Sequence, residues 1–107
     1  MILNEIGQSM EIDGVVYAVG AKIVANNKSE YRRLEGKIFE IATDDDKDTE
    51  NDGPDLYCCF EKPTDAEIIK RLEKDFSAIF CSPRTIDDII LDNVIMAPEE
   101  IDVIENP

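Results

Sequence analysis

The stretch LEGKIFEIATDDDKDTENDGPDLYCCF, residues 34–60, decides the fold that we expect for this 107-residue chain. Residues 36–41 and 55–60 contain β-branched and aromatic residues that favour strands, and the second run is apolar enough to be buried on both faces. Between them, residues 44–55 hold seven carboxylates and one lysine; we name this segment the acidic connection. It ends in Asp-Gly-Pro-Asp, a turn-forming sequence. The pattern predicts an antiparallel strand pair with an unusually acidic loop.

Shorter strands are expected on both sides of this stretch. In the run 11–17, an Asp-Gly pair can supply the two positive φ angles of a type I′ turn, which predicts a β-hairpin. Residues 21–25 and 93–97 are short apolar runs, the second ended by a proline, and each predicts a strand. The remaining residues, 99–107, are acidic, and we expect them to form one helical turn or to fray.

One amphipathic helix is predicted at about residues 64–78. Thr64 with Glu67 three residues later fits a capping box at its start. Apolar residues recur on one face at helical spacing: Ile68, Leu72, Phe76 and Ile79. Five or so short strands and one helix around one core predict a single α+β domain spanning 1–107. We expect a small, strongly bent antiparallel sheet or a closed barrel, which removes exposed strand edges.

The net charge of −14 is unevenly distributed along the chain. The acidic connection contributes 1 − 7 = −6, and residues 85–107, with seven carboxylates and no lysine or arginine, contribute −7. The remainder carries only −1. This balance argues against direct binding to nucleic acid or to an anionic membrane, since both recruit Lys and Arg. Two interpretations stay open: carboxylates that keep the protein soluble, or a docking face for a protein partner with a basic surface.

Cysteine and histidine content limits the possible chemistry. The absence of histidine excludes Ser-His and Cys-His nucleophile pairs and histidine metal ligands, and no glycine-rich phosphate loop occurs. The three cysteines form no C-x-x-C motif, which disfavours a disulfide framework or a thiolate zinc site and fits a reducing cytoplasm. We predict Cys58 and Cys59 as buried apolar residues and Cys81 as more exposed. No secretory signal or bilayer-spanning run is evident, and no cofactor is expected.

Two further patterns favour structural interpretations over chemical ones. Asp48–Gly53 resembles the first half of an EF-hand loop, but Pro54 takes the seventh position and Cys59 the twelfth, where a glutamate is needed. Carboxylates in a loop and a tail lack the burial or the close like charge that raises a catalytic pKa. We therefore expect no catalytic and no metal-binding residues; weak calcium binding and a small carboxylate-dependent enzyme are less favoured alternatives.

The segment Tyr31-Arg32-Arg33 is the basic exception in this acidic chain. An aromatic ring beside two arginines can stack on a base or bind a carboxylate. A surface turn that balances its acidic neighbours is our preferred interpretation.

Three blocks of sequence resemble the family of large polyvalent protein-associated domains, over about residues 15–98. These domains occur in gut Firmicutes and related bacteria, often encoded by phages, plasmids and conjugative elements. The family has no assigned activity, so the resemblance implies a mobile-element context and no mechanism. The blocks are Tyr31-x-x-Leu34-x-Gly36-x-Ile38-x-Glu40-Ile41, Glu50-Asn51-x-x-Pro54-Asp55-x-Tyr57-Cys58-x-Phe60 and Leu91-Asp92-x-Val94-Ile95-Met96-Ala97-Pro98.

A second resemblance is to SH3-like barrels of the KOW or Tudor kind, in which a Tyr-x-x-Leu-x-Gly turn precedes a strand. In this chain that turn is Tyr31 to Gly36. The resemblance implies a barrel but carries no function, because such folds host many unrelated activities.

Together these observations suggest a non-enzymatic interaction or accessory module of a bacterial mobile element. An alternative is a DNA-mimic inhibitor of a host DNA-binding protein, which needs the two acidic segments to join in one row of carboxylates. Acidic segments on opposite faces would count against it. The predicted partner-binding residues lie at the end of the acidic connection: Glu50, Asn51, Pro54, Asp55 and Tyr57.

Overall fold

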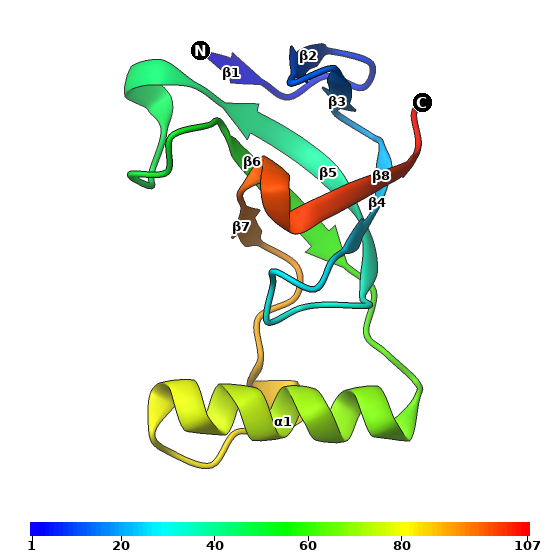
Figure 1. Cartoon of the computed structure of the whole chain (residues 1–107), viewed down its shortest axis with the longest axis vertical. Helices are drawn as coiled ribbons and strands as arrows, with labels where there is room; N and C mark the ends of the chain where they lie inside the picture. The colour runs from blue at the N-terminus through cyan, green and yellow to red at the C-terminus, as the bar shows by residue number, and fades with distance from the viewer.

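The computed structural model describes all of residues 1–107 and confirms the predicted α+β class (Figure 1). Its one α-helix is α1 (Ala66–Phe80), and its 3-10 helices are η1 (Asp44–Asp46), η2 (Ile86–Asp88) and η3 (Pro98–Glu100). The strands are β1 (Ile2–Leu3), β2 (Ser9–Ile12), β3 (Val15–Ala18), β4 (Lys22–Ala25), β5 (Glu35–Ala42), β6 (Asp55–Phe60), β7 (Val94–Met96) and β8 (Ile101–Glu105).

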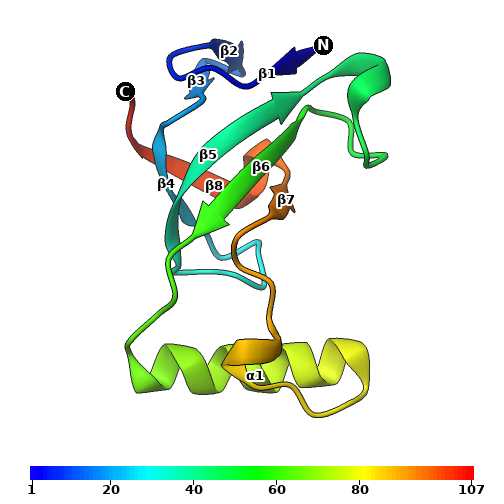
Figure 2. The same cartoon turned by 180° about the vertical axis from the view of Figure 1, so that it is seen from behind.

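Six strands form one antiparallel sheet of order β7-β6-β5-β4-β8, with β1 beside the end of β5. Along one edge, β5 pairs first with β4 and then with β1, while β6 follows its other edge. A register shift between Ile38 and Glu40 marks a bulge, which bends the strand. The predicted bent antiparallel sheet is present (Figure 2). The SH3-like barrel is not closed, because β7 has three residues and no ladder joins it to β8.

The central pair β5–β6 depends on a close backbone approach at Gly36. A Cβ atom at this position would lie 2.9 Å from Phe60 Cα and closer still to the carbonyl oxygen of Cys59. Only glycine leaves room for β6 there, since the atoms in the way belong to the backbone.

The hairpin predicted around Asp13-Gly14 is confirmed as β2 and β3. Ile12 pairs with Val15 across the turn, and Asp13 and Gly14 have φ angles of 50° and 83°. Both central residues therefore adopt the positive φ of a type I′ turn. The hairpin forms its own two-stranded sheet at one end of the molecule (Figure 1).

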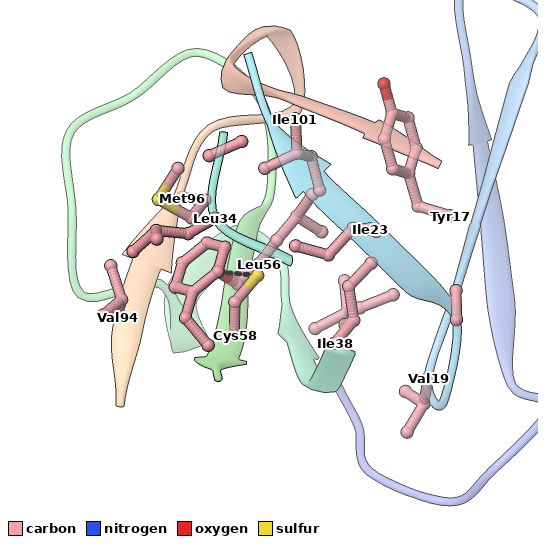
Figure 3. Packing of buried hydrophobic residues seen from close by; sticks show 14 of the residues in the cluster. Tyr17, Val19, Ile23, Leu34, Ile38, Leu56, Cys58, Val94, Met96 and Ile101 are labelled. Atoms are coloured by element: carbon pink, nitrogen blue, oxygen red, sulfur yellow. Dashed lines mark hydrogen bonds between the residues drawn. The ribbon is translucent and has the colours of Figure 1, made fainter. Parts of the chain in front are cut away.

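The core gathers side chains from five strands of the main sheet. Ile23 of β4, Ile38 of β5 and Leu56 of β6 are fully buried in one cluster with Met96 of β7 and Ile101 of β8 (Figure 3). Each fully buried aliphatic side chain stabilises the fold by roughly 1.5–3 kcal/mol.

Helix α1 crosses the end of the molecule opposite to the hairpin (Figures 1 and 2). Its N-cap is Asp65, whose carboxylate accepts hydrogen bonds from Glu67 N (2.8 Å) and Ile68 N (3.2 Å). The predicted capping box of Thr64 and Glu67 is therefore wrong. A carboxylate is at least as good a cap as a hydroxyl, and this one stands one residue nearer the helix.

The apolar stripe of α1 is shorter than predicted. Leu72 and Phe76 are buried, but Ile79 is 53% exposed. After Phe80, Cys81 takes a left-handed φ of 53° and the chain turns back, so no element covers the last turn on that face. The longest helix has 15 residues, and none has the length and hydropathy that a membrane crossing requires.

The C-terminal segment begins with a single helical turn, η3 at Pro98–Glu100, as one of our two alternatives predicted, but it continues as strand β8 instead of fraying. After η3, strand β8 pairs with β4 through Ile101↔Ala25 and Val103↔Ile23, and Ile101 is buried. Apolar and acidic residues alternate over Ile101-Asp102-Val103, as in a half-buried strand, whereas Ile104 breaks the alternation and is 53% exposed. The acidic composition of 99–107 concealed it.

Candidate functional site

A buried carboxylate holds the acidic connection in place through hydrogen bonds. Asp55, the first residue of β6, is 0% exposed. Its Oδ2 accepts hydrogen bonds from Asp48 N (2.7 Å) and Thr49 N (2.9 Å), and its Oδ1 accepts one from the Thr49 hydroxyl. Burial alone would raise the pKa of Asp55, but the hydrogen bonds from Thr49 and Asp48 hold it below its ordinary value.

Tyr57 supports the same loop from the neighbouring part of β6. Its hydroxyl donates a hydrogen bond to the carboxylate of Asp48, and its ring lies 6.2 Å from that of Phe39. The hydrogen bond to Asp48, with burial, raises the pKa of Tyr57 to about 12. The Tyr57 hydroxyl therefore keeps its proton and is engaged in a hydrogen bond to the loop.

Of the five predicted partner-binding residues, only two reach the surface. Glu50 and Asn51 are exposed, whereas Pro54, Asp55 and Tyr57 are buried. A partner can touch the first two directly. The other three shape the loop that presents them, a role that the sequence pattern does not distinguish from surface contact.

An open groove of about 510 Å³ lies between the acidic connection, the tip of the β2–β3 hairpin and the start of η3. Tyr17 of β3 joins two of these elements, because its hydroxyl donates to the carbonyl oxygen of Pro98 (3.2 Å). Gly53 of the acidic connection lies close to the Pro98 ring as well: a Cβ atom placed on Gly53 would be 3.4 Å from Pro98 Cγ. The groove is thus built from segments far apart in the sequence.

One wall of the groove, formed by the hairpin and the η3 side, carries all of its apolar residues. Ile12 and Val15 are a cross-strand pair on the hairpin, and Tyr17, two residues after Val15, lies on the same face. Ala97 and Pro98 line the groove from the η3 side. Val15 is 43% exposed, so this wall presents apolar surface to solvent.

The other wall, formed by the acidic connection, carries Glu50 and Asp52, and the first wall adds Asp13 and Glu99; these carboxylates have no partners. The lining includes no lysine or arginine, and none of the carboxylates in it forms a hydrogen bond or ion pair within the chain. Burial raises the pKa of Tyr17, and the charges of Asp102 and Asp13 raise it further, which shows how negative this region is. The groove carboxylates are Asp13, Glu50, Asp52 and Glu99.

The groove brings together parts of the two acidic segments. Glu50 and Asp52 come from the acidic connection, and Glu99 comes from the C-terminal segment. Asp87 and Asp88 of η2, however, lie beside α1 at the other end of the molecule (Figure 1). Sequence reasoning found the acidic connection but missed the hairpin residues and Glu99 as parts of one site, because long-range contacts such as Tyr17–Pro98 bring them together.

The basic segment around Tyr31 has a structural role. The Tyr31 ring lies between those of Phe60 and Phe76, with centroids 5.5 and 5.1 Å away, and its hydroxyl donates to the Ile90 carbonyl (3.0 Å). Arg32 pairs with Asp75 of α1 at 3.3 Å. Both contacts fasten α1 to the rest of the molecule, so the faces of the tyrosine ring are not free to stack on a base.

The three cysteines are free and differ in exposure. Burial raises the pKa of the Cys58 thiol to about 12. Cys59 is exposed, contrary to our prediction, because neighbouring residues of β6 face opposite sides and the outer side is uncovered there. Cys81 is exposed, as predicted. No group of three or more cysteine or acidic side chains is arranged to hold a metal ion.

Comparisons with known proteins assign no family to the chain. No family model, curated protein or solved structure matches the chain.

Proposed function

We propose that this chain is a non-enzymatic protein-interaction module, which binds a basic surface of a partner protein through the groove. The observation that carries the proposal is the pairing of unpartnered carboxylates with an exposed apolar wall. Charges that satisfy no internal contact attract a cationic partner and orient its approach. Apolar surface that leaves water supplies much of the affinity.

The proposed contact surface differs from the one expected from the sequence. Glu50 and Asn51 remain in it, and Asp13, Asp52 and Glu99 join them. The other three predicted residues are buried. Asp55 and Tyr57 hold the acidic connection through hydrogen bonds, and Pro54 is next to Asp55 in the chain. A preformed loop binds more tightly, because less conformational freedom is lost on binding.

The resemblance to large polyvalent protein-associated domains supplies the biological setting of this proposal. An accessory module of a bacterial mobile element would meet many basic proteins in the host, among them those that bind nucleic acid. This setting is an inference from the resemblance alone.

Affinity capture from a bacterial lysate, with charge-reversed variants, tests the proposed function. We expect the double variant Glu50→Lys/Glu99→Lys to lose partners that the native protein retains. The matched control is Asp45→Lys/Asp92→Lys, which makes the same charge change at exposed carboxylates outside the groove. Identical partner profiles for the native protein and the groove variant would refute the proposal.

A DNA mimic is the second candidate, favoured by the meeting of Glu50 and Asp52 with Glu99 in one groove. Two observations weigh against it: one wall is apolar, unlike a row of phosphates, and Asp87 and Asp88 lie elsewhere. Competition separates the two candidates. A captured partner that duplex DNA displaces in proportion to its concentration supports mimicry, and a partner indifferent to DNA supports the interaction module.

A further inference from the structure

We infer that the groove accepts an extended segment of the partner in which a lysine or arginine stands next to an aliphatic residue. This inference rests on the proposed function and specifies the chemistry of its partner. It follows from the two walls: the hairpin and the η3 side carry all of the apolar residues, whereas the acidic connection carries only polar residues and a glycine.

The apolar wall needs an apolar occupant. Ile12 and Val15 of the hairpin and Pro98 of η3 have no polar side-chain atom, and Val15 keeps 43% of its surface in contact with solvent. A small hydrated cation would leave this surface wet. An aliphatic side chain, or the methylene stem of a lysine or arginine, would cover it.

The groove carboxylates need a cation on the same ligand. Glu50, Asp52 and Glu99 have no internal partner, so their charges are available to an incoming group. Lysine and arginine combine an apolar stem with a charged end, so one such side chain can contact both walls. The volume of about 510 Å³ is in the range of sites that take small ligands, which suits a few consecutive residues of a chain.

The walls are held in place before binding. The Tyr17 hydroxyl fixes the hairpin to Pro98, and Asn26 fixes η3 by donating from its side chain to the Glu99 carbonyl oxygen and from its backbone to that of Glu100, both at 2.9 Å. Asp55 fixes the acidic connection through its three hydrogen bonds. The groove is therefore a preorganised surface, which reduces the entropic cost of binding an extended segment.

Nuclear magnetic resonance of the ¹⁵N-labelled protein tests the inference with a defined probe. The probe is a short end-capped peptide that alternates leucine and lysine, and the control peptide has serine in place of leucine. We expect the amide signals of Val15, Asn51, Gly53 and Glu99 to move with the first peptide, while that of Asp87 stays unchanged. The serine peptide should bind about three- to tenfold more weakly, because it leaves the apolar wall uncovered.

Two pairs of variants assign the effect to each wall. Val15→Thr keeps the β-branched shape but removes apolar surface, and we expect it to weaken binding of the leucine peptide about three- to tenfold. Its control is Val16→Thr, at a neighbouring residue that is 41% exposed and outside the groove, which should bind within about twofold of the native protein. Glu50→Gln/Glu99→Gln should weaken binding roughly tenfold at low salt and much less at high salt.

Thermal unfolding of each variant checks that it is folded, so that a loss of peptide binding can be assigned to the substituted side chain. Equal binding of the two peptides, or equal effects of Val15→Thr and Val16→Thr, would show that charge alone acts and would overturn the inference. The absence of peptide binding would overturn it too. The proposed function would survive that result if capture of a partner still depended on Glu50 and Glu99, and it would fail independently if capture did not.

Discussion

Asp55 shows how a single buried charge organises the candidate site. It accepts three hydrogen bonds from Asp48 and Thr49 while fully buried. Asp55→Asn keeps the shape but turns one acceptor into a donor that faces other donors. We expect the free energy of unfolding in urea to fall by about 2–3 kcal/mol. Asp45→Asn, at an exposed residue, should change it by less than about 0.5 kcal/mol, and equal effects would contradict this role.

The same carboxylate predicts a dependence of stability on pH. The folded pKa of Asp55 lies below its ordinary value of 3.8, so at acid pH the unfolded chain binds more protons than the folded one. This contribution is fully present above about pH 5 and is lost as the pH falls through 3.8 and then through the folded pKa. Urea unfolding at a series of pH values should show a shallower acid loss for Asp55→Asn than for the native protein.

A parallel loss in both proteins would contradict the assignment to Asp55. Asp88, whose pKa is lowered by backbone and side-chain hydrogen bonds from Thr85, contributes to the acid slope of both proteins alike. The difference between the two curves therefore isolates Asp55.

Gly36 gives a prediction about backbone space. A Cβ atom there meets the backbone of β6, which cannot rotate away, so we expect Gly36→Ala to lower the free energy of unfolding by about 3 kcal/mol. Gly53→Ala is the matched control. Its Cβ would make ordinary contacts of 3.4 and 3.5 Å with the Pro98 ring, and the expected change is within about 1 kcal/mol. Chemical denaturation of both variants checks the contrast, and a tolerated alanine at 36 would contradict it.

At the level of elements, the start of α1 distinguishes the observed cap from the expected one. Asp65→Ala removes the acceptor for two backbone N–H groups and should lower the free energy of unfolding by about 1 kcal/mol. Thr64→Ala should have little effect, because Thr64 accepts no hydrogen bond there. Thermal unfolding followed by circular dichroism compares the two variants. A larger loss of stability for Thr64→Ala than for Asp65→Ala would show that Thr64 caps the helix.

Local signals were sufficient for elements whose residues determine their own conformation. The Asp13-Gly14 turn, the run that becomes β6 and the middle of α1 were predicted because turn chemistry and periodicity act within a few residues. Strand β8 was missed, since acidic residues concealed its alternation. The groove was missed because Tyr17 and Pro98, on which it depends, are 81 residues apart.

The whole molecule carries a net charge of −14, and folding concentrates that charge in a small volume. Mutual repulsion of like charges destabilises the compact state. Raising NaCl from about 20 mM to about 500 mM should screen this repulsion and increase the free energy of unfolding by on the order of 1 kcal/mol. Urea unfolding at both salt concentrations measures the change, and a decrease would show that attractive ion pairs dominate instead.

The connection between β6 and β7 has a consequence for how such a protein evolves. These strands pair directly, with Leu56 opposite Met96 and Cys58 opposite Val94, although residues 61–93 separate them along the chain. The intervening segment, which includes α1, is therefore an excursion from one hairpin and lies at the end of the molecule away from the groove (Figure 1). Under the proposed function, this excursion can be lengthened, shortened or exchanged without changing any residue that lines the groove, so a surface free to diversify is separate from the one proposed to recognise a partner.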